Sequence, residues 1–223
     1  MGLKKISKPE PLSKTALRML RQSILANELE TGVIYNEKGL AADLGISRTP
    51  VREALLELSA KKLIRFLPQK GVVINTFSDE DIEDVFEIRT ALEIFSIKKI
   101  CGCLEKEDLS RLKGFLTAQK KAAAADDRAG FMAEDNNYHI GFTSLTGNNY
   151  LIEMMQNIRD IMHLMGARAI DLEGRMQEVV KEHEAIMAAI SREDVSAAIG
   201  EMVSHLEKSK AAVKKVYGQV KET

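Results

Sequence analysis

The chain has 223 residues, of which 45% are hydrophobic and 29% charged, the balance typical of soluble globular proteins. Its two cysteines are too few for a disulfide scaffold, and no apolar run reaches the roughly 20 residues that a membrane-spanning helix needs. The first residues also lack the apolar stretch of a signal peptide. We therefore expect a cytoplasmic protein with no membrane partner.

The net charge of −1 conceals two parts of opposite charge. Residues 1–76 contain 13 Lys and Arg but only 7 Asp and Glu, a net charge of +6. The remaining 147 residues contain 19 basic and 26 acidic side chains, a net charge of −7. This asymmetry indicates that one part binds a polyanion while the other has a different task. We predict two domains, residues 10–76 and 78–218, joined by a short linker.

Two helices are predicted at the start of the basic segment. The first follows Ser13, a candidate N-cap, and ends before Gly32. Its apolar side chains recur at helical spacing at Leu17, Leu20 and Ile24. The second helix spans about residues 37–44, with Asn36 as its N-cap and Gly45 in the tight turn that follows.

A third helix begins after Ser47 and carries basic side chains on one face. Pro50 lies in its first turn, where the missing N–H removes no hydrogen bond. Its buried face is predicted at Val51, Ala54, Leu55 and Leu58. Arg48 and Arg52 must then point away from the core. Two short helices joined by a glycine turn, the second exposing basic residues at its N-terminus, are typical of a helix-turn-helix.

A β-hairpin is predicted directly after the third helix. The runs 64–67 and 72–74 are rich in residues that favour strands, and Pro68 and Gly71 favour a turn between them. This hairpin places Lys70 at its tip. The whole segment is therefore predicted to be a winged helix-turn-helix domain.

Arg48 and Arg52 are one helical turn apart, so both can reach into one groove of double-stranded DNA. The arginine fork matches the O6 and N7 atoms of guanine. The other expected contacts are with a base or a phosphate for Thr49, and with backbone phosphates for Lys38 and Lys70. The alternative is a solvated helix face on which the arginines pair with acids of the same helix, Glu53 and Glu57.

The stretch "YNEKGLAADLGISRTPVREALLEL", residues 35–58, closely resembles the DNA-reading segment of the GntR family of bacterial transcription regulators. The following "LIRFLPQKGVVI" is similar to the wing of that family. The resemblance covers about residues 12–76. It implies that operator DNA is contacted at the positions Lys38, Arg48, Thr49, Arg52, Lys70 and Gly71.

The acidic segment opens with a helix capped by Ser78, and acids fill its first turn, as the helix dipole favours. Its apolar stripe is predicted at Ile82, Val85, Phe86, Leu92 and Phe95. Arg89 falls inside this stripe, and a half-buried guanidinium requires an anionic partner. That partner is either Glu93, one turn further on, or the carboxylate of a bound ligand.

Five further helices are predicted in the acidic segment, and nothing there indicates a strand. They span about residues 106–126, 128–145, 149–171, 173–190 and 193–217. The expected fold class is therefore mainly α, with an N-terminal winged helix-turn-helix domain and a C-terminal all-α bundle of six helices.

Three histidines and one aspartate are candidate metal ligands. Asp135 and His139 are one helical turn apart, and His183 and His205 lie near the centres of the last two predicted helices. Three imidazoles and one carboxylate suit a divalent metal ion such as zinc, nickel or manganese, and leave positions open for water or an anion. From spacing alone, the alternative is that the histidines are separate core residues with satisfied hydrogen bonds.

The motifs "IRTALE", "DNNYH", "EHEAIMAAI" and "MVSH", in that order, resemble the FCD domain, the all-helical effector domain of the FadR branch of GntR regulators. Six helices resemble the VanR-type subgroup of that branch. The resemblance covers about residues 80–210, and Tyr138 departs from the phenylalanine that is usual there. It implies a divalent metal ion at the floor of a ligand cavity, held by Asp135, His139, His183 and His205.

These features predict a metabolite-responsive transcription repressor. A homodimer would bind a palindromic operator, and a small carboxylate would bind at the metal site and pair with Arg89. One alternative is the same regulator with a metal-free effector cavity. Another is a metal-dependent hydrolase tethered to DNA, with Glu182 or Glu184 as its base. Both glutamates are equally well explained as solvated groups or supports for metal ligands, so we expect no enzymatic activity.

Overall fold

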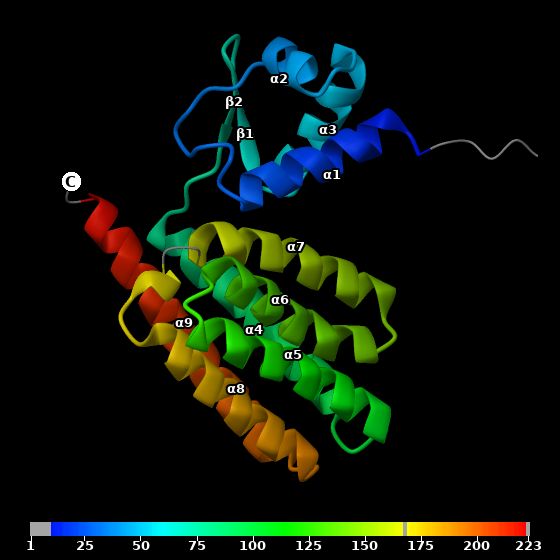
Figure 1. Ribbon diagram of the computed structural model, residues 1–223, viewed down its shortest axis with the longest axis vertical. Helices are drawn as coiled ribbons and strands as arrows, with labels where there is room; N and C mark the ends of the chain where they lie inside the picture. Colours follow the sequence, from blue (N-terminus) through cyan, green and yellow to red (C-terminus); the bar gives the residue numbers. More distant parts are fainter. Residues whose placement is uncertain (1–9, 167–168, 222–223) are drawn as a thin grey trace, which may run out of the picture. The chain divides into compact units, whose positions relative to one another are not determined.

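The computed structural model describes residues 10–166 and 169–221 (Figure 1). The chain divides between Thr76 and Phe77 into two compact units, each with its own buried residues. Within the described residues, none of the helices could span a membrane.

The first unit combines three helices with a two-stranded sheet. Its elements are α1 (Leu12–Leu25), α2 (Glu37–Asp43), α3 (Arg48–Ala60), β1 (Ile64–Leu67) and β2 (Gly71–Ile74). α3 contacts both α1 and α2, and its buried side chains are those that the sequence predicts: Val51, Ala54, Leu55 and Leu58. Because these apolar residues of α3 pack inside the unit, its basic face points outward.

The helix caps of the first unit agree only in part with the sequence prediction. Asn36 caps α2, since its Oδ1 accepts from the backbone N–H of Gly39 at 2.8 Å. Ser47 occupies the N-cap of α3 but makes no side-chain capping bond. The prediction for Ser13 is wrong, because α1 begins at Leu12 with Pro11 as its N-cap residue. The fixed φ of Pro11 suits this position, and its carbonyl accepts the first helical N–H groups.

The wing is an antiparallel hairpin in which Ile64 pairs with Ile74 and Leu67 with Gly71. Gly71 has φ +134, and a Cβ atom there would lie 2.2 Å from the backbone oxygen of Tyr35. The backbone of Tyr35 exchanges two hydrogen bonds with Val72, of 2.8 and 2.9 Å. The glycine is therefore required by this close approach.

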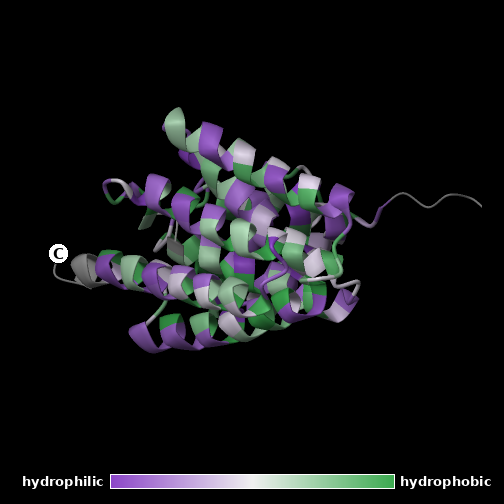
Figure 2. Ribbon diagram, turned by 90° about the horizontal axis from the view of Figure 1, so that it is seen from below, coloured by the Kyte–Doolittle hydropathy of each residue, from purple (hydrophilic) through white to green (hydrophobic). Residues whose placement is uncertain are grey.

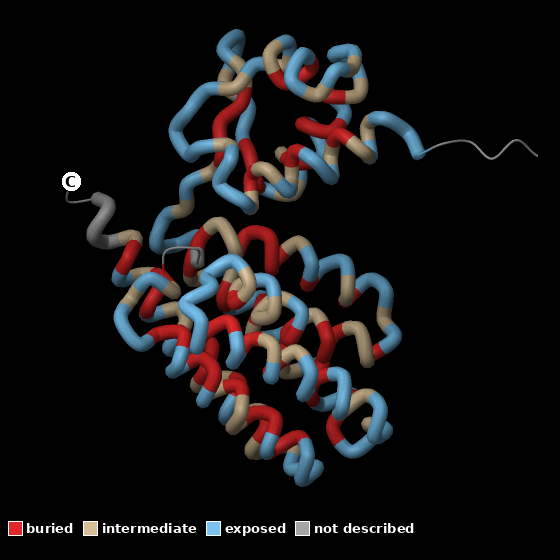
Figure 3. The backbone as a smooth tube through the Cα atoms, viewed as in Figure 1, coloured by how far each residue is buried: buried red, intermediate tan, exposed pale blue. Residues whose placement is uncertain are grey.

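The second unit is a bundle of six α-helices with one short 3₁₀ segment. The helices are α4 (Asp79–Ile100), α5 (Lys106–Ala124), α6 (Arg128–Leu145), α7 (Asn149–Gly166), α8 (Arg175–Ser191) and α9 (Val195–Lys221). Hydrophobic and hydrophilic residues alternate along them (Figure 2), and the buried residues follow their inner sides (Figure 3). The expected all-α architecture is therefore confirmed.

One predicted helix is too long. The range 149–171 was expected as a single helix, but α7 ends at Gly166 and the 3₁₀ segment Ala169–Asp171 follows. Residues 167 and 168 lie outside the described part of the chain. A glycine at this position ends the helix readily, because glycine has one of the lowest helix propensities.

α4 runs through the middle of the bundle and contacts α6, α7 and α9. Ser78 and Asp81 form the capping box at its start, with bonds of 3.0 and 2.8 Å. The predicted apolar stripe is wrong at Phe95, which is 49% exposed, and Val85 and Leu92 are only half-buried. The buried face instead follows Ile82, Phe86, Arg89, Glu93, Ser96, Ile97 and Ile100. This face carries a guanidinium and a carboxylate into the interior of the bundle.

Candidate functional site

Basic side chains gather at the exposed start of α3. The side chains of Arg48 and Arg52 are each 66% exposed, and Thr49 between them is exposed as well. On the preceding helix, Lys38 is exposed, and Lys70 is exposed in the turn of the wing. Each of these side chains is therefore accessible to a ligand that binds the first unit from solvent.

Both arginines share one acidic neighbour. Arg48 Nη2 lies 3.3 Å from Glu37 Oε2, and Arg52 Nε lies 3.9 Å from Glu37 Oε1. The acids expected from the sequence as partners, Glu53 and Glu57, lie on α3 itself, whereas Glu37 lies on α2. Exposed ion pairs of this kind contribute only about 0–1 kcal/mol, so a phosphate or a base can replace Glu37. Two guanidinium groups against one carboxylate also leave a net positive charge at the start of α3.

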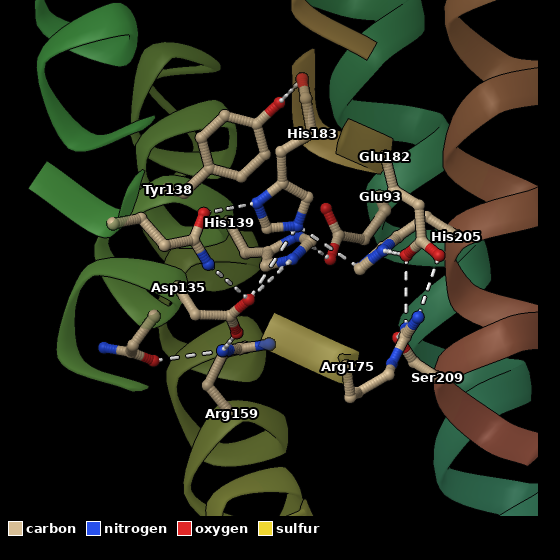
Figure 4. Close-up of polar contacts among 12 residues, drawn as sticks. Glu93, Asp135, Tyr138, His139, Arg159, Arg175, Glu182, His183, His205 and Ser209 are labelled. Carbon is tan, nitrogen blue, oxygen red and sulfur yellow. Dashed lines mark hydrogen bonds and ion pairs between the residues drawn. The ribbon is translucent and has the colours of Figure 1, made fainter. Parts of the chain in front are cut away.

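Three histidines meet in the core of the second unit (Figure 4). His139 comes from α6, His183 from α8 and His205 from α9, and all three are buried. Their ligand nitrogens all lie within 4.8 Å of one another. The Nε2 atoms of His183 and His205 are 3.4 Å apart, close to the roughly 3.3 Å that separates two nitrogens on one tetrahedral zinc ion.

Each imidazole has an oxygen next to its Nδ1 atom. His183 Nδ1 donates to Gln119 Oε1 at 2.8 Å, and His205 Nδ1 donates to Glu182 Oε2 at 2.7 Å. His139 Nδ1 lies 2.7 Å from Glu93 Oε1, although the direction of its N–H departs from hydrogen-bond geometry. The acceptors at His183 and His205 place the proton of each of these neutral rings on Nδ1. Their Nε2 lone pairs are therefore free at the 3.4 Å approach of the two rings, an arrangement that suits a cation and orients ligands as metal sites require.

Asp135 supplies a carboxylate beside the three rings. Its Oδ1 lies 3.8 Å from His183 Nε2 and 4.0 Å from His139 Nε2. Gln119 Nε2 donates to the same oxygen at 3.1 Å, while Arg159 contacts Oδ2. Although burial opposes ionisation, the positive charge of Arg159 holds the pKa of Asp135 well below its usual range. The three histidines thus form one cluster. Asp135, the fourth candidate ligand from the sequence, lies beside the cluster with its carboxylate engaged by Gln119 and Arg159.

The imidazoles are held neutral by their surroundings. Burial lowers the pKa of His139 and His183 well below the usual histidine value, and it lowers the pKa of His205 in the same direction. The nearby cation of Arg89 acts in the same sense on all three rings. Neutral rings are the form in which histidine binds metal ions.

Arg89 contacts both an acid and a histidine of the cluster. Its Nε donates to Glu93 Oε1 at 3.1 Å, and its Nη2 lies 2.9 Å from His139 Nε2. Burial lowers the pKa of Arg89 to about 10, so the guanidinium is still charged at neutral pH. Glu93 is therefore the partner of Arg89 within this chain, and the same arginine also borders a cavity.

A cavity of about 60 Å³ adjoins the histidine cluster. Its lining includes His205 of the cluster and the neighbouring Asp135. Three arginines also line it: Arg89, Arg159 and Arg175. Arg175 is held by Glu182 and by Ser209 Oγ, the latter at 3.0 Å. This concentration of guanidinium groups suits a small anionic ligand.

Of these arginines, only Arg89 was expected at the site from the sequence. Arg159 could have been predicted by the same reasoning, because it also lies in an apolar stripe, between Ile158 and Ile161 of α7. Gln119 and Arg175 could not have been predicted from the sequence, since their roles depend on the packing of α5 and α8 against other helices. The fourth histidine, His163, is not part of the cluster.

A winged helix-turn-helix with an exposed basic face, followed by a helical bundle with a polar core, defines a two-domain DNA-binding transcription regulator. Residues 12–74 match the family of bacterial regulatory proteins called the gntR family, and residues 84–208 match the FCD domain. The chain belongs to the GntR family of transcription regulators and carries an FCD domain.

Known proteins similar to this chain are regulators of the same kind. It is 22% identical to the uncharacterized regulator YdhC of Bacillus subtilis over 98% of both chains. It is 23% identical to the repressor RspR of Escherichia coli K12, over 93% of this chain and 91% of RspR. The solved structure of E. coli McbR/YncC shares the fold, with a TM-score of 0.82 at 19% identity, over 94% of this chain and 100% of that one. These relatives are regulators and not enzymes, so the hydrolase alternative is set aside.

Proposed function

We propose that this regulator represses transcription by binding a palindromic operator as a homodimer, and that a small carboxylate bound at a metal site in its FCD domain controls this binding. The observation that carries the proposal is the convergence of three buried histidines whose ligand nitrogens lie within 4.8 Å of one another, with the Nδ1 atoms of His183 and His205 bonded to Gln119 and Glu182. The DNA-binding part follows from the exposed basic face of α3.

The proposed DNA contacts are Lys38, Arg48, Thr49, Arg52, Lys70 and Gly71. The exposed arginines Arg48 and Arg52 suit the edges of guanine bases in the major groove. Lys38 and Lys70 suit backbone phosphates, which position the protein without reading the sequence. Gly71 serves this interface indirectly, because it lets the wing pass close to the backbone of Tyr35.

Exposed apolar side chains support the homodimer. Ile88 and Phe95 are both 49% exposed and lie two helical turns apart on α4. On α7, which packs against α4, Tyr150 is 82% exposed and Met154 is 55% exposed. A second copy that covers these residues would remove large apolar groups from water. A two-fold arrangement would also match a palindromic operator.

The proposed metal ligands are Asp135, His139, His183 and His205, and the proposed ion is divalent: zinc, nickel or manganese. Such an ion would supply an electrophilic centre to which an oxygen of the ligand can bind. Arg89 is proposed to pair with the remaining charge of the carboxylate, since it borders the cavity next to the cluster. Repression would be relieved if the liganded form binds the operator less well.

Metal content tests this proposal. Full-length protein purified without chelators should contain about one transition-metal ion per chain by plasma mass spectrometry. The variant His183→Asn should lose the metal, while His163→Asn should keep it, because His163 lies outside the cluster. Folded protein without any metal, even after incubation with zinc, nickel and manganese, would favour a metal-free effector cavity instead.

A further inference from the structure

Arg89 and the proposed metal ion require the same atom. Arg89 Nη2 lies 2.9 Å from His139 Nε2, within hydrogen-bond distance. A guanidinium can only donate, so His139 Nε2 is the acceptor and the proton of the neutral ring lies on Nδ1. This Nε2 lies 4.0 Å from Asp135 Oδ1, the oxygen that is 3.8 Å from His183 Nε2, so it is on the side of the ring that borders the cluster.

An imidazole nitrogen has one lone pair. It can accept a hydrogen bond from the guanidinium or coordinate a metal ion, but it cannot do both. A guanidinium next to His139 Nε2 and a metal ion on the same nitrogen would also repel each other strongly inside a buried site. Binding of a metal ion to His139 must therefore move Arg89 Nη2 away from it.

The surroundings provide a place for the displaced group. Glu93 is fully buried, and its Oε2 has no hydrogen-bond donor. The Nε of Arg89 is anchored on the other oxygen of this carboxylate at 3.1 Å. Arg89 can thus leave His139 while it keeps its ion pair with Glu93, and it already lines the adjoining cavity.

The other two cavity arginines are not placed to act in this way. Arg159 is bound to Asp135 and, at 3.3 Å, to Asn136. Arg175 is bound to Glu182 and Ser209. Among the described contacts, only Arg89 donates to a nitrogen that faces the centre of the cluster.

We propose that Arg89 competes with the metal ion for His139 Nε2, so that Arg89 limits metal affinity and becomes available to a carboxylate in the cavity only after metal has bound. This inference rests on the metal site proposed above. It makes metal and carboxylate mutually reinforcing ligands, because coupling between two binding sites is reciprocal. The regulator would then respond to its carboxylate only when metal is present.

Zinc affinity of the full-length, chelator-stripped protein tests the competition. Zinc is titrated against a chromophoric chelator with the wild type, Arg89→Gln, Arg89→Lys and the surface control Arg128→Gln, whose side chain is 54% exposed. We expect Arg89→Gln to bind zinc about 10-fold more tightly than the wild type, because no charge-assisted hydrogen bond has to be broken. Arg128→Gln should remain within about threefold of the wild type, as expected for a screened surface charge.

Arg89→Lys separates the hydrogen bond from the charge. It keeps the positive charge but lacks the Nη2 atom, so we expect it to bind zinc more tightly than the wild type and less tightly than Arg89→Gln. Affinity equal to that of the wild type would overturn the proposal in favour of charge repulsion alone. Unchanged or weaker zinc binding by Arg89→Gln, with native circular dichroism, would also overturn it.

A crystal structure of the zinc-loaded wild type provides the second measurement. The proposal expects Arg89 Nη2 beyond hydrogen-bond distance from His139 Nε2, and an unchanged contact would contradict it. If the wild type itself binds no zinc, nickel or manganese, the metal site fails and the competition with it. If the wild type binds metal and Arg89→Gln does not bind it more tightly, only the competition fails.

Discussion

His205 Nδ1 donates to Glu182 Oε2 at 2.7 Å, and this carboxylate is in turn held by Arg175 at 2.8 Å. Although burial opposes ionisation of Glu182, its bonds to His205 and Arg175 lower its pKa, so it is a carboxylate at neutral pH. A charged acceptor on Nδ1 fixes the ring and makes Nε2 a stronger base. Glu182 thus has the role of a support for the proposed metal ligand rather than that of a base acting on a substrate.

We therefore expect Glu182→Gln to weaken zinc binding about 10-fold to 100-fold, the usual effect of removing the support of a ligand. Glu184→Gln is the matched control, because Glu184 is 43% exposed and pairs only with Lys120 among the contacts described. Isothermal titration of both chelator-stripped variants with zinc measures the difference. Equal affinities would show that Glu182 does not support a metal ligand.

For the DNA interface, we expect Arg52→Ala to lose about 10-fold or more in preference for its operator over random DNA, since one good base contact contributes about 1–3 kcal/mol of discrimination. The operator can be selected from a random duplex library with the wild-type protein and then used in gel-shift titrations. Arg18→Ala on α1, whose side chain is 57% exposed and pairs with Glu10, is the control and should keep the preference. A retained preference in Arg52→Ala would contradict the assignment.

Substitution of Glu37 should strengthen DNA binding rather than weaken it. Its carboxylate lies 3.3 Å from Arg48 and 3.9 Å from Arg52, so it competes with DNA for both guanidinium groups. We expect Glu37→Gln to raise affinity for random duplex DNA several-fold at low salt, because an acid is removed from a surface that faces phosphates. Asp43→Asn, on the same helix, is the control for a change of net charge. If both variants gain affinity equally, the effect is one of net charge alone.

Gly71 should tolerate no side chain. A Cβ atom there would lie 2.2 Å from Tyr35 O, and φ is +134. We expect Gly71→Ala to lower the free energy of unfolding by more than about 1 kcal/mol. Gly45→Ala, which also has positive φ but no atom within 4 Å, should cost less. Urea unfolding of the two variants makes the comparison. Equal losses of unfolding free energy would show that the close approach to Tyr35 is not what requires glycine at position 71.

The stability of the metal-free protein should fall in acid. Burial lowers the pKa of His139, His183 and His205 below the unfolded value of about 6.5, so the unfolded chain takes up protons first as pH falls. Each such histidine removes about 1.4 kcal/mol of unfolding free energy per pH unit below that value. Glu93 acts with the opposite sign, because burial raises its pKa, but it is one group against three.

Urea unfolding in the presence of a chelator, at about pH 7 and about pH 5.5, measures this dependence. The wild type should be clearly less stable at the lower pH. A wild type whose stability stays constant between these values would mean that the histidines do not remain neutral in the folded protein.

Local patterns were sufficient to predict much of the fold. The buried face of α3 and the two wing strands follow from apolar spacing and from turn residues that act over a few positions. Phe95 is exposed although it was predicted to be part of the apolar stripe of α4. Such a pattern identifies apolar side chains on one helix face, but it does not show whether another element packs on each of them. The missed cap at Pro11 has a similar cause, since Ser13 is a good capping residue that lies one position inside the helix.

The candidate site was predictable only as a set of residue types. Asp135 and His139 are linked by helical spacing, but their approach to His183 and His205 depends on how α6, α8 and α9 pack. Gln119 could not be found from the sequence, because its bridge between His183 and Asp135 exists only in the packed bundle. The contact between Arg89 and His139, 50 residues apart, is of the same kind.

X-ray absorption at the metal edge of the full-length protein, purified without chelators, examines the proposed metal site itself. We expect one ion bound by imidazole nitrogens and oxygen at about 2.0–2.2 Å, with the multiple-scattering pattern of three histidines. His139→Gln should reduce the number of imidazoles, and His163→Gln should not. A sulfur-rich coordination shell, or no bound metal in protein that still binds its operator and responds to a carboxylate, would contradict the account.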